Sequence, residues 1–226
     1  MSRRILMALV FALTLCLGAP PAAAFEVRPI VSDIELPSDR GGVTLTIANP
    51  RTSVLPITFR VVERGVNEDG SEVQTPADAE FVIFPQQLTV EPGQSRAVRV
   101  QYVGASPQRS RSFTLYAEEP AVDLEPGVSG VRTRLVIGAS VHVFDAGTRP
   151  DPVIAETQPV DGGMRVTLEN RGTRYTYIDA LLLRFGEVEY GGVNLGSIAG
   201  RTLLPPGGRR TFVVPNVSVT PTLVAP

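Results

Sequence analysis

The stretch of residues 131–144 constrains the fold more than any other part of this chain. Its odd-numbered positions are apolar except for Thr133, and most of them are β-branched. Successive side chains leave a strand on opposite sides, so this alternation predicts a β-strand with one apolar face. The strand is predicted to be long, since most strands contain about five or six residues. A strand of this length can contribute to the core of its own domain and to a surface for a partner.

Residues 1–24 have the features of an export signal. Arg3 and Arg4 supply positive charge, an apolar run follows, and the small residues Ala22-Ala23-Ala24 end the segment. The run is short for a bilayer span, and the small residues suit cleavage by signal peptidase. We therefore expect cleavage before Phe25 and a periplasmic mature protein.

The composition of the mature chain excludes several classes of function. Its only cysteine, Cys16, lies within the predicted signal, so no disulfide is expected to stabilise the fold. Removing Arg3 and Arg4 from the 21 basic residues leaves 19, against 23 acidic residues, for a net charge of −4. Every basic residue is an arginine and no basic tract occurs, which argues against nucleic acid as a partner.

Short β-rich runs separated by turn residues recur along the chain, and no segment of 11 or more residues has helical spacing. The pattern predicts an all-β protein made of two immunoglobulin-like β-sandwich domains, the second of them small. One glycine and two prolines at residues 146–152 predict a linker. We therefore place the N-terminal domain at 25–145, with its long strand at 131–144, and the C-terminal domain at 153–226.

Turns such as Asn67-Glu68-Asp69-Gly70 and Glu91-Pro92-Gly93-Gln94 separate the predicted strands. In the N-terminal domain the strands before the long one are predicted at residues 43–47, 57–62, 81–84, 88–90, 97–103 and 113–117. In the C-terminal domain they are predicted at residues 164–168, 178–183, 188–190 and 211–214.

The sequence lacks the residue combinations of common enzymes. A single histidine and the absence of cysteine from the mature chain argue against Ser-His-Asp and Cys-His catalysis and against a His-rich metal site. Glu118-Glu119 and the pair Glu187 and Glu189 are the obvious groupings of carboxylate residues in the sequence. A solvated strand face explains Glu187 and Glu189 better than an acid–base site does. We expect no catalysis, no cofactor and no metal.

Segments spread over most of the mature chain follow the pattern of a known family. In the first domain they comprise a strand ending in Asn, a proline, a Pro-Gly turn, a Val-Arg-Val strand and the run before the long strand: residues 44–49, 85, 90–95, 98–100 and 111–120. Residues 162–170, 196 and 205–207 match the second domain less specifically. With these segments the chain resembles the periplasmic pilus-assembly chaperones, the PapD-like family.

The resemblance implies donor-strand complementation. Pilin-like subunits of that family lack their last strand, and the long strand of the chaperone fills the exposed groove through main-chain hydrogen bonds and alternate side chains. In this chain the donor residues would be Leu135, Ile137, Ala139 and Val141, with Thr133 at the margin. The alternative, that these residues only fill the core of their own domain, stays open.

The family also holds the C-terminal carboxylate of the subunit with an arginine on the first strand and a lysine on the long strand. The lysine position falls on His142, and the chain contains no lysine. The arginine position falls near Ser32-Asp33, and Arg28 would replace it only with a shift in register. His142 and Arg28 are therefore the candidate anchor residues.

We expect a periplasmic chaperone that binds incomplete pilin-like subunits and delivers them to an outer-membrane usher, without nucleic acid or a small-molecule substrate. A second copy of the chain is another candidate partner, because dimerisation caps an exposed apolar strand. The alternative is a non-enzymatic periplasmic scaffold or interaction module of the same fold that does not handle pilins. The altered anchor positions favour this alternative. A carbohydrate-binding sandwich is disfavoured because the chain has no tryptophan.

Overall fold

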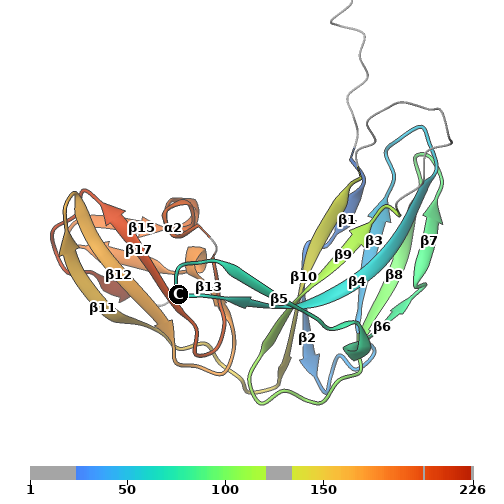
Figure 1. Ribbon diagram of the computed structural model, residues 1–226. Coiled ribbons are helices and arrows are strands. Elements are labelled where there is room, and N and C mark those ends of the chain that lie inside the picture. The colour runs from blue at the N-terminus through green and yellow to red at the C-terminus, as the bar shows by residue number, and fades with distance from the viewer. Residues whose placement is uncertain (1–23, 121–133, 201, 225–226) are drawn as a thin grey trace, which may run out of the picture.

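The computed structural model describes residues 24–120, 134–200 and 202–224, which form two β-rich lobes joined at an angle (Figure 1). The predicted export signal, apart from Ala24, and residues 131–133 of the predicted long strand lie outside the described residues. The lobes contain separate sheets with separate cores, which confirms the predicted all-β class with two sandwich domains.

The N-terminal domain packs two sheets against each other. Its strands are β1 (Glu26–Arg28), β2 (Val31–Leu36), β3 (Val43–Ala48), β4 (Leu55–Val66), β5 (Glu72–Pro76), β6 (Phe81–Phe84), β7 (Gln87–Val90), β8 (Ser95–Tyr102), β9 (Arg111–Glu118) and β10 (Val136–Asp145), with the 3-10 helix η1 (Asp78–Glu80) before β6. One sheet has the order β1-β3-β8-β6. The other has the order β2-β10-β9-β4-β5, and β7 also pairs with β4.

The C-terminal domain is smaller and has a short helix. Its elements are β11 (Pro152–Val160), β12 (Gly163–Asn170), β13 (Thr176–Tyr177), the 3-10 helix η2 (Ile178–Ala180), β14 (Leu182–Phe185), β15 (Val188–Gly191), α2 (Gly192–Ala199), β16 (Leu203–Leu204), β17 (Arg209–Pro215) and β18 (Thr222–Val224). The sheets have the orders β11-β12-β17, β13-β16 and β15-β14-β18.

Alternating apolar residues build both cores, as the strand pattern predicts. In the first domain Leu45 and Ile47 on β3 face inward together with Val98 on β8, and all three are fully buried. In the second domain Val166 and Leu168 on β12 do the same. Because burial of apolar surface is the main stabilising contribution to folding, these two cores account for a stable fold without disulfides.

Two predicted strands differ in the structure. β10 begins at Val136, so Arg134 and Leu135 precede the strand instead of belonging to it. The predicted strand at residues 178–183 is wrong in its first half, where the chain forms η2. Ile178 and Leu181 are both buried, and a 3-10 turn places residues three apart on one face, whereas a strand would direct them to opposite faces.

Asn170 is a buried side chain that joins the end of β12 to neighbouring loops. Its Nδ2 donates to the carbonyls of Arg174 at 2.7 Å and Leu204 at 3.1 Å. Its Oδ1 accepts hydrogen bonds from the N–H groups of Asp151 and Gly172, both at 3.0 Å. The asparagine therefore satisfies four main-chain groups at once.

We expect Asn170→Leu to lower the free energy of unfolding by about 2–4 kcal/mol, because it leaves those buried main-chain groups without partners. Chemical denaturation measures this change. Asn194→Leu, at an exposed position on α2, is the control and should change stability by less than about 0.5 kcal/mol. Equal effects of the two substitutions would contradict this role of Asn170.

Candidate partner-binding site

The first half of β10 has a hydrogen-bonded neighbour on one side only. β9 pairs with β10 from Val136 to Val143, whereas β2 pairs with it only from Ser140 to Asp145. Within residues 24–120, 134–200 and 202–224, no strand pairs with the other side of residues 136–139. Figure 1 places this end of β10 near β1, which belongs to the opposite sheet.

The directions of the main-chain groups define the unpaired side. The N–H of Ser140 donates to the carbonyl of Ile30 at 2.8 Å, on the side of β2. The carbonyl of Leu135 accepts a hydrogen bond at 3.2 Å from the residue after β9. Neighbouring residues of a strand direct their N–H and C=O groups to opposite sides, and alternate residues direct them to the same side. The N–H and C=O groups of Val136 and Gly138 therefore point to the same side as those of Ser140, away from β9. We call this side of residues 136–139 the open edge.

The predicted donor residues face the core of their own domain. Ala139 and Val141 are 0% and 1% exposed, and both belong to that core. These two residues fill the core of their own domain in this structure, and their role as donor residues stays a prediction. Leu135 and Ile137 are half-buried and pack against the same core. They therefore retain accessible surface beside the open edge.

An ion-pair network fixes the chain where β10 begins. Arg60 Nε lies 2.6 Å from one carboxylate oxygen of Glu118, and Arg134 donates to the other. Arg134 Nε also donates to the carbonyl of Glu119 at 2.8 Å. Glu118 is almost fully buried, and its two arginines hold residue 134 against the end of β9. By contrast, Glu187 and Glu189 are exposed, as expected for a solvated strand face.

His142 is fully buried where the two domains meet. Its Nδ1 lies 2.9 Å from Ser112 Oγ, its Nε2 lies 2.7 Å from the hydroxyl of Tyr177, and its ring stacks on Tyr175 with centroids 3.7 Å apart. Burial, assisted by two nearby arginine charges, lowers the pKa of His142 to about 3. His142 is thus enclosed in this structure, and its role as a carboxylate anchor stays a prediction.

Further contacts between the domains surround His142. Asp33 on β2 accepts hydrogen bonds from Arg174 at 3.0 Å and from the hydroxyl of Tyr175 at 2.6 Å. The Arg174 guanidinium lies 3.7 Å from the ring centroid of Phe144, within the range of a cation–π contact. We call this group of residues, together with His142, the hinge cluster.

The other candidate anchor, Arg28, is exposed and pairs with Glu26 at 2.9 Å. It lies on β1, in the opposite sheet from His142, and does not line the pocket described next. The structure therefore does not bring the two expected anchor residues together.

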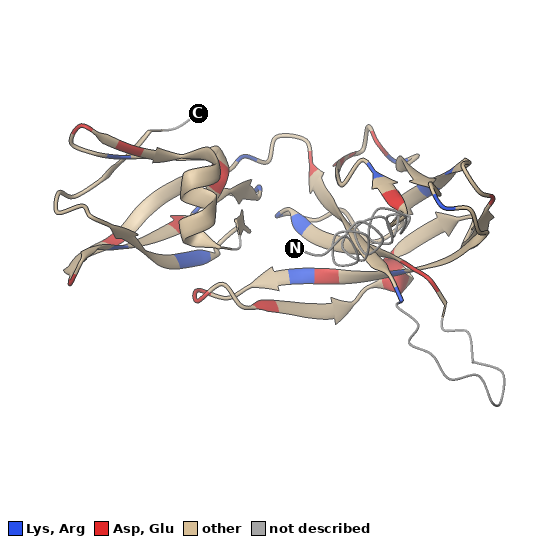
Figure 2. Ribbon diagram, turned by 90° about the horizontal axis from the view of Figure 1, so that it is seen from above, with Lys and Arg blue, Asp and Glu red and all other residues tan. Residues whose placement is uncertain are grey.

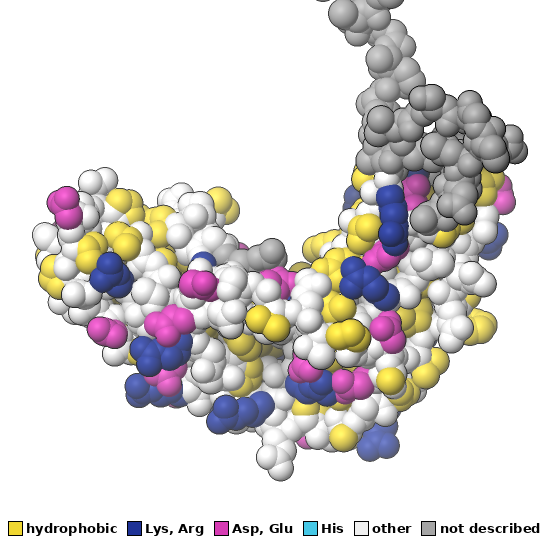
Figure 3. All heavy atoms as spheres, viewed as in Figure 1, with side chains coloured by type: hydrophobic (Ala, Val, Ile, Leu, Met, Phe, Trp, Pro, Cys, Tyr) yellow, Lys and Arg dark blue, Asp and Glu magenta, His cyan; other side chains and the backbone are white. Residues whose placement is uncertain are grey.

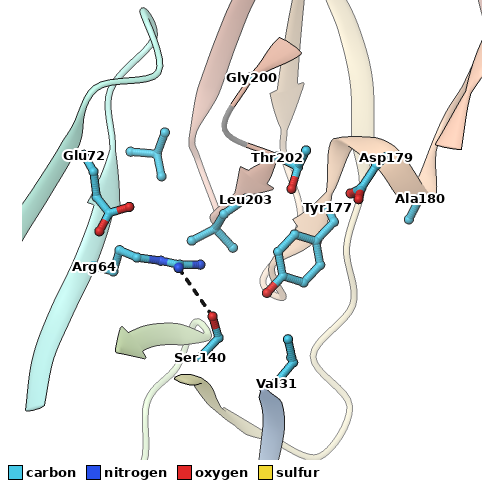
Figure 4. A pocket seen from close by; sticks show the side chains of 11 residues that line it. Val31, Arg64, Glu72, Ser140, Tyr177, Asp179, Ala180, Gly200, Thr202 and Leu203 are labelled. Carbon is cyan, nitrogen blue, oxygen red and sulfur yellow. Dashed lines mark hydrogen bonds between the residues drawn. The ribbon is translucent and has the colours of Figure 1, made fainter. Parts of the chain in front are cut away.

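A pocket of about 610 Å³ lies between the domains (Figure 4). The β4–β5 hairpin forms one wall, the C-terminal domain forms the opposite wall, and β2 and β10 form the floor. Figure 3 shows a hollow between the two lobes. The pocket is lined by Val31, Arg64, Val66, Glu72, Ser140, Tyr177, Asp179, Ala180, Gly200, Thr202 and Leu203. We call it the interdomain pocket.

Among the described residues that line the interdomain pocket, Arg64 is the basic one. Its Nη1 donates to Ser140 Oγ at 3.4 Å, and its buried Nε has no hydrogen-bond partner. In the described part of the chain Arg64 forms no ion pair. The sequence did not reveal this residue, because the strand predicted at 57–62 extends to Val66 in the structure.

Acidic and basic residues are interspersed over both lobes (Figure 2). Among the described residues, no group of three or more His, Cys, Asp or Glu side chains could hold a metal ion. No helix in the same ranges is long and apolar enough to cross a membrane.

The fold is shared with solved structures of fimbrial chaperones. A chain of the Salmonella enterica SafA pilin–SafB chaperone complex has 15% identity and a TM-score of 0.60, covering 92% of this chain and 99% of that one. The E. coli chaperone DraB has 20% identity and a TM-score of 0.58, covering 87% and 88%. A chain of the Acinetobacter baumannii CsuC–CsuE chaperone–tip adhesion subunit complex has 15% identity and a TM-score of 0.59, covering 89% and 97%.

No protein-family model and no curated protein sequence matches this chain. At the identities given above, the structural comparison establishes the fold. The chain has the two-domain, immunoglobulin-like fold of the fimbrial chaperones, as the sequence resemblance predicted.

The burial of His142 predicts a specific dependence of stability on pH. The unfolded chain takes up a proton near pH 6.5, whereas folded His142 does so only near pH 3, so stability is lost as the pH falls between these values. We expect a decrease of about 2 kcal/mol in the free energy of unfolding from pH 7.5 to pH 5. His142→Gln should remove most of this decrease in denaturant titrations, and an equal decrease in both proteins would contradict the assignment.

Proposed function

We propose that this protein is a periplasmic chaperone that binds incomplete pilin-like subunits by adding the open edge of β10 to their sheet. The observation that carries the proposal is the unpaired side of residues 136–139. An apolar strand with unpaired main-chain groups favours pairing with another chain. The shared fold with fimbrial chaperones and the predicted export signal support the same function, which involves no catalysis.

The main chain and the side chains of this strand would have separate tasks. The N–H and C=O groups of Val136 and Gly138 would extend the sheet into the partner, as in other complexes formed by strand addition. Leu135 and Ile137 would contact the partner's apolar groove with their accessible surface. Ala139 and Val141 would remain in the core of the chaperone. Fewer side chains of β10 would therefore contact the subunit than the alternation of residues 131–144 predicts.

Arg64 would bind the C-terminal carboxylate of the subunit in place of His142 and Arg28. Arg64 lines the interdomain pocket, where its Nη1 donates to Ser140 Oγ, and arginine forms strong charge-assisted hydrogen bonds with carboxylates. The subunit would thus contact the open edge with its groove and the pocket with its end. Delivery to an outer-membrane usher completes the proposed function.

The alternative function is a periplasmic scaffold of the same fold that does not handle pilins. Two observations favour it. His142 is enclosed in the hinge cluster, and Arg28 is exposed and paired with Glu26, so neither expected anchor is available in the interdomain pocket. A scaffold of this kind would not need the open edge for binding.

We expect Ile137→Asp to reduce capture of a pilin-like subunit at least about tenfold, because it places a charge against an apolar groove. The measurement is recovery of the soluble complex after periplasmic co-expression with a subunit that lacks its last strand. Ile137→Val is the matched control and should retain capture. Unchanged capture by the aspartate variant would refute the proposed contact.

A second variant separates binding from packing, because Ile137 also touches the core. Val136→Pro removes an N–H from the open edge but no hydrogen bond to β9. We expect normal thermal stability and at least about tenfold weaker capture, whereas Val136→Thr should behave like the wild type. Gly138 is unsuitable for this test, since a Cβ there would lie 2.8 Å from Thr114 Cγ2.

Arg64→Gln tests the carboxylate anchor. It should weaken binding of a subunit with a free C-terminal carboxylate about tenfold and leave binding of the same subunit with an amidated C-terminus unchanged. Arg165→Gln, at an exposed position on β12, is the control for loss of an arginine. Equal loss for both subunit forms would exclude carboxylate recognition by Arg64.

A further inference from the structure

The hairpin formed by β4 and β5 extends from the N-terminal domain to the C-terminal domain (Figure 1). Its tip, residues 67–71, contacts β17. The N–H of Thr211 donates to the carbonyl of Glu68 at 3.0 Å, and Thr211 Oγ1 donates to Glu68 Oε1 at 2.7 Å. The domains are therefore joined at a second place, away from the hinge cluster.

The tip of the hairpin packs against Arg210. This arginine is 6% exposed, and its guanidinium donates to the carbonyls of Glu68, at 3.3 Å, and of Ala199 at the end of α2. Gly70 lies against the guanidinium with φ of 86°, and a Cβ at this position would overlap it. Only a glycine therefore fits this conformation and this close approach.

The contact is built from few and individually weak interactions. In the described part of the chain Arg210 forms no direct ion pair, although the charge of Asp69 in the tip attracts it, and its buried Nε has no hydrogen-bond partner. Burial lowers the pKa of Arg210, which indicates that its positive charge is poorly solvated. The pair of Arg209 and Glu68 spans 3.8 Å at an exposed position, where ion pairs contribute little. If the tip undocked, water would reach Arg210. Only the few hydrogen bonds between the tip and β17 would be lost.

The same hairpin bounds the interdomain pocket. Arg64, Val66 and Glu72 belong to its two strands and form one wall. The facing wall, which includes Asp179 and Thr202, belongs to the C-terminal domain. Docking of residues 67–71 on β17 attaches the hairpin wall to the C-terminal domain, so undocking of the tip would change access to the pocket.

We propose that residues 67–71 form a releasable latch, which undocks from β17 to admit the end of a partner chain to the interdomain pocket and then docks again. The hinge cluster holds the domains together while the latch opens. The identity of the partner as a pilin-like subunit rests on the proposed function, whereas the latch itself does not depend on it.

A reversible crosslink tests whether the latch must open. Glu68→Cys combined with Thr211→Cys places two cysteines at the docked contact, in a mature chain that otherwise has none. The oxidised form should bind a pilin-like subunit at least about tenfold more slowly than the same protein after reduction. The wild type, with and without reductant, is the control. Equal association rates of the oxidised and reduced forms would overturn the latch.

Amide hydrogen exchange tests the latch without a partner. The N–H of Thr211 points to the hairpin. The N–H of the next residue, Phe212, therefore points to the opposite side, toward β12, with which β17 pairs. A latch requires the Thr211 amide to exchange at least about tenfold faster than the Phe212 amide. Equal protection would overturn the latch even if subunits bind. Fast exchange at Thr211 in a protein that binds no subunit would support the latch and refute the proposed function.

Discussion

The hydrogen bond from Ser140 to Ile30 marks the point at which β10 loses its second neighbour. Beyond it, toward Val136, β2 no longer pairs with the strand, and the main-chain groups of residues 136–139 face outward. Main-chain groups that are buried in proteins are nearly always hydrogen-bonded. An apolar strand with an open edge therefore favours pairing with a strand of another chain. Pairing with β9 and the ion pair of Arg134 with Glu118 hold this strand in a fixed conformation.

The arrangement of the two domains follows from contacts of different strength. The hinge cluster combines stacked rings, a buried neutral His142 and charges paired with Asp33. The tip of the β4–β5 hairpin adds only a small contact around Arg210. The interdomain pocket lies between these two places, and Arg64 faces it. One side of the pocket is therefore held firmly and the other side is held weakly.

The sequence predicted those features that depend on local pattern. Alternation at residues 131–144 identified β10 and its inward face, because the spacing of apolar side chains directly reflects which side of a strand is buried. The helix α2 was not predicted, since it is short, contains glycines and is held by packing of Leu195 and Ala199. The enclosure of His142 and the position of Arg64 in the interdomain pocket were not predicted, because both depend on contacts with the other domain, which strand periodicity does not reveal.

Amide exchange of β10 in the complex with an incomplete pilin-like subunit shows whether the subunit pairs with the open edge. We expect the amides of Val136 and Gly138 to exchange quickly in the free protein and to become protected when the subunit binds. The amides of Ile137 and Ala139, which face β9, should be protected in both states. Binding of the subunit without new protection at Val136 and Gly138 would show that the open edge is not the binding site.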